Sequence, residues 1–147
     1  SALCTSFKVE LLEGDHDFNN GADAFKVALF KANASITGTY SAATTNYSDM
    51  TGNSDELPAS GNYTTGGFAL TNVNPTSTGT TAFTDFSANA SWASATFTTR
   101  GCLIYNTNDG NSCVAVINFG ADYSVSGGTF EIQWPTADSS NAIIRIA

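Results

Sequence analysis

The only histidine of the chain, His16, stands between two carboxylates, Asp15 and Asp17. An imidazole in such a setting can act as a general base or bind a metal ion. A general base also needs a second group placed beside it, and a hydrolase triad would depend on this one histidine. The sequence offers no such partner, so we expect His16 to lie in a solvated turn.

Asp15, Asp17 and Asn19 match the first three ligand positions of a calcium-binding loop. The match fails at the sixth position, where Asn20 replaces glycine, and at the twelfth, where Lys26 replaces glutamate. This pattern leaves at most a weak cation site, and we assign no metal ligand.

Asp85 and Glu131 both stand beside apolar residues in predicted strands, and a pair of carboxylates could hydrolyse a glycosidic bond. We interpret both as ordinary residues on the outward face of an acidic sheet.

The glycine pairs 66–67 and 127–128 lack the lysine and the following helix of a phosphate loop, and indicate turns or bulges before strands. We therefore predict no catalytic residue, no cofactor-binding residue and no enzyme activity.

Cys4, Cys102 and Cys113 are an odd number of cysteines, which argues against the disulfide framework of a secreted protein. Cys102 and Cys113 flank a predicted hairpin turn and could form a bond across it. The alternative, which we favour, is that both are small buried hydrophobic side chains.

Arg100 and Arg145 stand in apolar predicted strands. A guanidinium close to a core needs a carboxylate, so we expect structural ion pairs, with contacts to a partner protein as the alternative.

Trp92 stands between small residues in a polar bend, where a large aromatic side chain either marks a contact surface or covers the end of a core. Both interpretations stay open. Five side chains are our candidates for contact with a partner: Leu3, Phe7, Tyr47, Tyr63 and Trp92.

The composition limits what elements can hold these residues. The 147 residues carry three lysines, two arginines and a net charge of −8, which excludes the basic surface that nucleic acid requires. There is no apolar run of a length that crosses a membrane, and the first residues lack the pattern of a signal peptide. Thr, Ser, Asn and Gly dominate over the residues that favour helices, so we expect an all-β protein.

Apolar alternation bounded by turn residues predicts one domain over residues 1–147. Its fold should be a single antiparallel β-sandwich, jelly-roll-like, of about seven or eight strands. One short helix is expected at 5–13, because Phe7 and Leu11 are four residues apart and Gly14 follows. We expect strands at 25–30, 68–73, 81–86, 95–105, 113–119, 129–134 and 142–147, and a hairpin turn at 106–112. The predicted core comprises Phe25, Val27, Leu29, Leu70, Phe83, Phe97, Leu103, Val114, Val116, Phe119, Ile132, Ile144 and Ile146.

Two segments are our candidates for mobile contact regions. The first is the N-terminal segment from Ser1 to Phe7. The second is a polar surface excursion at about 39–62, which contains few residues typical of a core. Five apolar or aromatic side chains should hold that excursion: Tyr40, Tyr47, Met50, Leu57 and Tyr63.

Four segments of the chain resemble a family of small virion proteins of tailed bacteriophages: FKVALF at 25–30, TGGFALTNV at 65–73, RGCLIYN at 100–106 and AIIRIA at 142–147. Their order and spacing fit across most of the chain, and residues 40–62 depart most from the pattern. The resemblance implies a capsid decoration (cement) protein that binds the major capsid protein on the outside of an assembled head. Such a protein would be assembled in the host cytoplasm. We expect a homo-oligomer, because linked copies gain avidity, and favour a trimer, because it matches the local three-fold points of an icosahedral shell. The alternative is a receptor- or glycan-binding module on a tail or surface appendage, with Tyr47, Tyr63 and Trp92 stacking on sugar rings.

Overall fold

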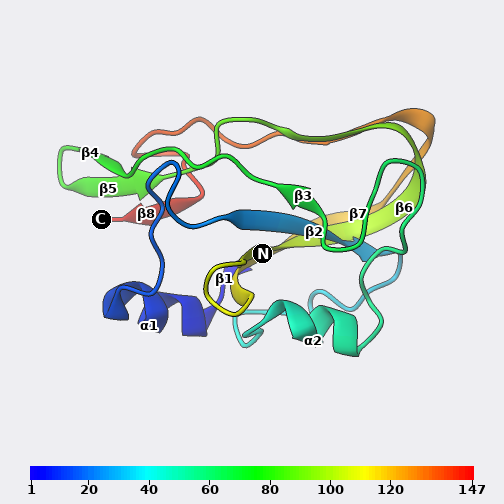
Figure 1. The fold of residues 1–147 in the computed structure, drawn as a ribbon, viewed down its shortest axis with the longest axis horizontal. Coiled ribbons are helices and arrows are strands. Elements are labelled where there is room, and N and C mark those ends of the chain that lie inside the picture. The colour runs from blue at the N-terminus through cyan, green and yellow to red at the C-terminus, as the bar shows by residue number, and fades with distance from the viewer.

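In the computed structural model, which describes residues 1–147, eight strands form two antiparallel sheets, and the predicted all-β class is confirmed. Five strands pair in the order β1-β7-β6-β2-β3 and three in the order β4-β5-β8. The strands are β1 (Ala2–Leu3), β2 (Phe25–Lys31), β3 (Phe68–Ala69), β4 (Thr76–Thr78), β5 (Thr81–Thr84), β6 (Ala90–Asn106), β7 (Ser112–Ile132) and β8 (Ile144–Ile146). The helices are α1 (Thr5–Glu13) and α2 (Tyr47–Gly52), and both lie on the same side of the larger sheet (Figure 1).

Strands β6 and β7 form one long hairpin that curves at its far end (Figure 1). The predicted strands at 113–119 and 129–134 are parts of β7, which also includes the glycine-rich segment between them. Gly101 of β6 pairs with Asn118 and Thr99 with Tyr123, so four residues of β7, 119–122, stand opposite a single residue of β6, Arg100. This irregularity bends the hairpin, and the rings of Phe97 and Phe130 pack 5.4 Å apart.

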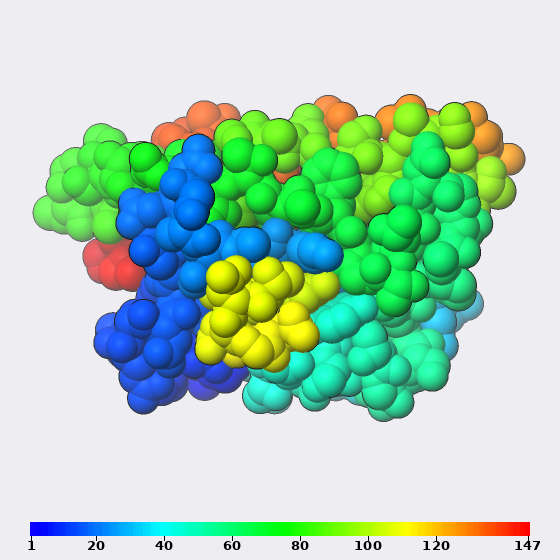
Figure 2. All heavy atoms as spheres, viewed as in Figure 1, coloured from blue at the N-terminus to red at the C-terminus, as the bar shows by residue number.

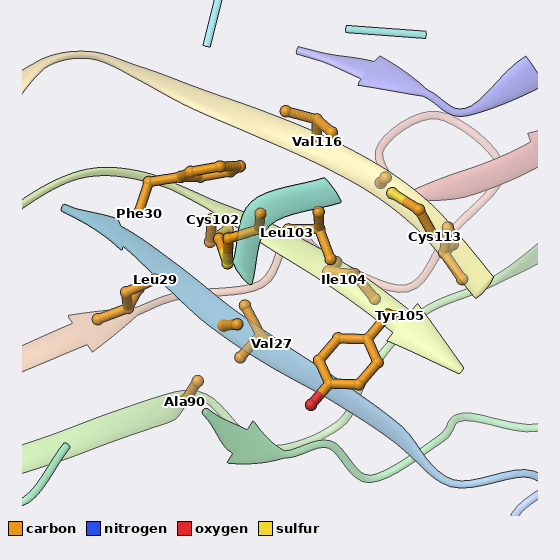
Figure 3. Packing of buried hydrophobic residues seen from close by; sticks show 14 of the residues in the cluster. Val27, Leu29, Phe30, Ala90, Cys102, Leu103, Ile104, Tyr105, Cys113 and Val116 are labelled. Atoms are coloured by element: carbon orange, nitrogen blue, oxygen red, sulfur yellow. The ribbon is translucent and has the colours of Figure 1, made fainter. Parts of the chain in front are cut away.

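The core is centred on β2 and β6. Both faces of β2 are covered, since Val27 and Ala28 point in opposite directions and neither is exposed. Figure 3 shows Val27 of β2 beside Leu103 and Ile104 of β6, and Leu29 is paired with Cys102. Nine of the predicted core residues are buried: Phe25, Val27, Leu29, Phe83, Phe97, Leu103, Val114, Val116 and Ile144. Leu70, Phe119 and Ile132 are half-buried, and Ile146 is 58% exposed because it lies on an edge strand next to the C-terminus.

Helix α1 has the predicted bounds. It ends at Gly14, which adopts a left-handed conformation with φ 88° and donates its N–H to the carbonyl of Glu10. Glycine adopts this conformation without the steric cost of a Cβ atom. Phe7 is the buried residue of the helix and anchors it to the sheet.

The N-terminal segment is not a mobile arm. Strand β1 pairs with β7, the N–H of Cys4 donates to the carbonyl of Val114, and Ser1 accepts a hydrogen bond from the N–H of Asn118. Cys4 and Phe7 are both fully buried. The expectation of a mobile segment is wrong because β1 completes the sheet, and Cys4 and Phe7 complete the core.

The excursion at 39–62 is also packed, and it contains α2, which we did not predict. Asn46 begins this helix in a capping box with Asp49. Four of the five expected anchors are buried and one is half-buried: Tyr40, Met50, Leu57 and Tyr63, with Tyr47.

The excursion covers the edge of β2. The N–H of Leu57 donates to the carbonyl of Leu29, and the N–H of Leu29 donates to the hydroxyl of Tyr63. These bonds supply the partners that an unpaired strand edge lacks. The segment is therefore part of the structure's framework rather than a loose contact region.

Candidate functional site

His16 lies in the interior and not in a solvated turn, so that expectation is wrong. Its side chain is fully buried, and its ring packs 5.0 Å from the ring of Phe7. The Nε2 atom is 2.9 Å from a carboxylate oxygen of Glu10, and the Nδ1 atom is 3.0 Å from the amide nitrogen of Asn106. The sequence did not indicate that His16 is buried, because Asn106 is far from it along the chain and Glu10 is an ordinary polar residue of a helix.

The hydrogen bonds of Asn106 determine which nitrogen of His16 carries the proton. The Asn106 side-chain oxygen accepts from the N–H of Asn108, and its nitrogen donates to Asp23. The amide therefore presents N–H to His16, whose Nδ1 accepts and whose Nε2 donates to Glu10.

Glu10, His16 and Asp109 are the one group of three potential ligands close enough to hold a metal ion. A metal ion at Nε2 of His16 would have to displace the proton that this nitrogen donates to Glu10, because a ligating nitrogen must be deprotonated. The cluster serves as a structural link instead. It joins α1 to the tip of the β6–β7 hairpin, residues 106–112, which lies between α1 and the segment that includes α2 (Figure 2).

The calcium-like residues are engaged in turns. Asp17 accepts hydrogen bonds from the backbone and side chain of Asn19, and its own N–H donates to Asp23. These contacts close the loop that carries the chain from α1 to β2. Asp15 belongs to no group of three His, Cys, Asp or Glu side chains within reach of one ion.

Asp85 and Glu131 occupy different environments. Glu131 is exposed and accepts from Asn89 and Gln133, as expected for an outward-facing residue. Asp85 is buried, so its outward orientation was wrongly predicted. It accepts from the N–H groups of Phe86 and Ile143, and its burial raises its pKa.

Arg100 forms the expected structural ion pair, with 3.5 Å between its guanidinium and Asp122. This pair links β6 to residues 119–122 of β7 at the bend. Arg145 is exposed and makes no ion pair, so the same prediction is wrong for that residue.

Cys102 and Cys113 do not meet. In the hairpin, Cys102 is opposite Ile117 and Cys113 is opposite Tyr105, and Figure 3 shows the two cysteines apart on their two strands. All three cysteines are buried, as the favoured interpretation predicted.

Three of the five predicted contact residues are buried and cannot present a surface: Phe7, Tyr63 and Trp92. Trp92 packs against Phe68 and Phe130, with ring centroids 5.5 and 6.0 Å away. The long β6 strand runs through the predicted polar bend and turns Trp92 inward, which favours the interpretation that it covers a core. Leu3 and Tyr47 are half-buried, and their contact role stays a prediction.

Glu56 is the centre of a hydrogen-bond network beneath the excursion at 39–62. The sequence did not indicate this network. The Glu56 carboxylate accepts from the hydroxyls of Tyr47 and Tyr63 and from the N–H of Gly66. Burial and the nearby Glu56 carboxylate raise the pKa of Tyr63 above its ordinary value, although the hydrogen bond from the N–H of Leu29 acts in the opposite direction. Burial likewise raises the pKa of Tyr105 to about 12. These phenols stay protonated at neutral pH and act as hydrogen-bond donors in a structural network.

The clearest candidate for an interaction site is an apolar groove of about 450 Å³ on β7 and the residues after it. We call it the β7 groove. Its apolar lining comprises Ile117, Phe119, Tyr123, Phe130, Ile132, Trp134, Pro135 and Ile143, with Glu131 and Gln133 beside them. Tyr123 is 52% exposed. The period-two spacing of Phe130, Ile132 and Trp134 was visible in the sequence, but we expected Ile132 to belong to a closed core.

A second apolar hollow adjoins the β7 groove and shares Ile117 and Ile143 with it. Leu3 of β1 lines this hollow. The apolar surface therefore extends from the bend of the hairpin to the N-terminal strand.

No family model, curated protein or solved structure matches the chain. Neither helix has the length and apolar character needed to span a bilayer.

Proposed function

We propose that this chain is a structural protein of a tailed-phage particle that binds the outer surface of the assembled head and stabilises it. The β7 groove is the observation that carries the proposal. Monomeric soluble proteins seldom leave a concave cluster of aromatic and aliphatic side chains open to solvent unless a partner covers it. The resemblance of four strand segments to small phage virion proteins supplies the identity of that partner, the major capsid protein.

The charge of the protein supports a contact of this kind. At −8, the protein would be repelled by a strongly acidic surface, so the receiving surface is neutral or basic, or the contact is mainly apolar. The polar residues beside the groove, Glu131 and Gln133, supply hydrogen-bonding groups at its rim. Aromatic centres with a polar rim are typical of specific protein interfaces.

Stabilisation follows from mass action, because a ligand that binds the assembled shell and not its separate subunits shifts the equilibrium toward the shell. A homo-oligomer gains avidity, which can exceed the affinity of a single site by ~10²–10⁴. We propose a trimer, which matches the local three-fold points of an icosahedral shell.

The test measures binding of the purified protein to heads that lack it. Tyr123→Ser removes an exposed aromatic side chain from the groove, and Leu12→Ser removes an apolar side chain that is 88% exposed on α1. We expect the Tyr123 variant to bind heads at least ~10-fold more weakly, as for a residue near the centre of an interface. The Leu12 variant should bind as the unchanged protein does. Equal binding by all three proteins, or a loss with Leu12→Ser alone, would contradict the role of the groove.

The second candidate function is glycan binding by the same groove. Tyr63 and Trp92 are buried and cannot stack on sugars, but Tyr123 and Trp134 line the groove beside the amide of Gln133. Aromatic faces with neighbouring polar groups suit sugar rings. A glycan array separates the candidates, because specific binding that Tyr123→Ser abolishes would favour the glycan-binding module over the decoration protein.

A further inference from the structure

Cys4 and Cys113 meet in the core, although 109 positions separate them in the sequence. Their sulfur atoms lie 2.7 Å apart, and neither residue is exposed to solvent. This separation is shorter than the packing distance of two unbonded sulfur atoms. It approaches the ~2.05 Å of a disulfide bond.

The backbones on both sides are held in place by hydrogen bonds. The N–H of Cys4 donates to the carbonyl of Val114 at 3.0 Å, and the N–H of Cys113 donates to the carbonyl of Thr45 at 2.9 Å. Leu3, just before Cys4, is paired with Ala115 of β7. A bond between the sulfurs therefore needs only a small adjustment of two side chains and no rearrangement of strands.

We propose that Cys4 and Cys113 form a disulfide bond when the protein encounters an oxidant of the disulfide class, such as glutathione disulfide. The two thiols lose two protons and two electrons, and glutathione disulfide takes up both to give two molecules of reduced glutathione. In the first exchange the Cys4 thiolate attacks glutathione disulfide, and one glutathione leaves. In the second exchange the Cys113 thiolate attacks the Cys4 sulfur of this mixed disulfide, and the second glutathione leaves.

The oxidant reaches the sulfur atoms of Cys4 and Cys113 when the N-terminal strand β1 is open. The thiolate is the attacking species, and the hydrogen bond to Cys4 together with burial raises the pKa of the Cys113 thiol in the closed structure. Strand β1 has two residues and lies at the edge of the sheet. Its opening, or folding in the presence of the oxidant, exposes both sulfurs to reaction.

Cys102 has no part in this bond. It is fully buried on β6, opposite Ile117, and burial raises the pKa of its thiol. The chain therefore contains one reactive pair and one isolated cysteine, which explains how an odd number of cysteines is compatible with a specific bond.

The experiment refolds the chain from denaturant in a buffer of reduced and oxidised glutathione. The refolded protein is then unfolded again in denaturant that contains iodoacetamide, so that buried free thiols are alkylated too, and the peptides are mapped by mass spectrometry. We expect one alkylated cysteine, Cys102, and a cross-linked peptide pair that contains Cys4 and Cys113. The Cys102→Ala variant should give the same cross-link. The Cys4→Ala variant should give no intramolecular cross-link.

Thermal unfolding provides a second readout. A bond that closes a loop of more than ~100 residues restricts the unfolded chain, so Tm should rise by at least ~5 °C relative to the reduced protein. Cys4→Ala should show the same Tm with and without reductant. Three alkylated cysteines after refolding, a cross-link through Cys102, or a Tm that does not depend on reductant in the unchanged protein would overturn the proposal.

Discussion

Phe119 and Phe130 belong to the same strand, β7, yet the centroids of their rings lie 6.1 Å apart. In a straight strand, residues at these positions would be separated by about 35 Å. The strand therefore bends back on itself, and its pairing with β6 is interrupted at residues 119–122, which stand opposite the single residue Arg100. One bent hairpin thus creates both the aromatic packing around Trp92 and the β7 groove.

Gly101 is required at the bend because of the space around it. A Cβ atom there would lie 2.3 Å from the carbonyl oxygen of Ile117 and 2.4 Å from a methyl carbon of Ile36. We expect Gly101→Ala to lower the free energy of unfolding by about 2 kcal/mol, since the backbone of β7 must move. Chemical denaturation measures the change. Gly52→Ala is the matched control, because nothing lies near its Cβ position and its φ is not positive, and a loss as large as that of Gly101→Ala would argue against a packing effect.

Asp55 should make the free energy of unfolding depend on pH. Its burial alone would raise its pKa, but hydrogen bonds from Tyr40 and Lys31 and the charge of Lys31 leave the pKa below the ordinary value of 3.8. A carboxyl with a lower pKa in the folded state stabilises the fold above its unfolded pKa, and this contribution is lost as the pH falls through the folded value. Asp55→Asn should therefore cost about 1 kcal/mol at pH 7 and progressively less below about pH 4.

Urea titrations of the Asp55 variant across this pH range provide the measurement. Glu13→Gln is the control, since Glu13 is exposed at the end of α1 and makes no ion pair within 4 Å. A destabilisation by Asp55→Asn that is the same at pH 3 and pH 7 would show that the hydrogen bonds, and not the charge, account for its role.

His16 should matter for stability and not for function. His16→Ala removes the link between Glu10 and Asn106 and leaves buried polar groups without partners, so we expect a loss of about 2 kcal/mol in the free energy of unfolding. Asp15→Ala, an exposed neighbour, should change it by less than ~0.5 kcal/mol. Both folded variants should bind heads equally well. Loss of binding by a folded His16 variant would show that this cluster is a functional site.

Deletion of residues 1–6 should unfold or strongly destabilise the protein rather than only weaken its binding. The deletion removes β1 and the fully buried Cys4 and exposes the edge of β7. Circular dichroism during heating gives the readout. A shortened chain with an unchanged Tm would mean that the N-terminal segment contributes little to the fold and is free to act as a contact arm.

Local signals in the sequence were sufficient for several elements. Gly14 marked the end of α1, and Asp109 and Gly110 marked the turn between β6 and β7, because each depends on a few neighbouring residues. The direction in which a side chain points depends on long-range packing. Trp92 was ambiguous for this reason, since its burial depends on Phe68 and Phe130 from other parts of the chain.

The β7 groove and the pair of Cys4 and Cys113 could not be predicted from local sequence patterns, because both depend on long-range packing. The polar excursion held the signal for α2, in the Asn46 and Asp49 pair of its capping box, but its high content of small polar residues concealed it. The fold-back of β7 leaves no periodic signal, because Gly120 and Gly127 are typical both of a loop and of an irregular strand. Cys4 and Cys113 become neighbours only when β1 pairs with β7.

The most direct test of the decoration function measures the temperature at which heads rupture. Heads made without this protein are heated beside normal heads and beside deficient heads to which the purified protein has been added back. We predict that the deficient heads rupture at a lower temperature, that the added protein restores the normal value, and that Tyr123→Ser restores it poorly. Deficient heads that are as robust as normal heads, with the protein found in a few copies on tails, would contradict the account.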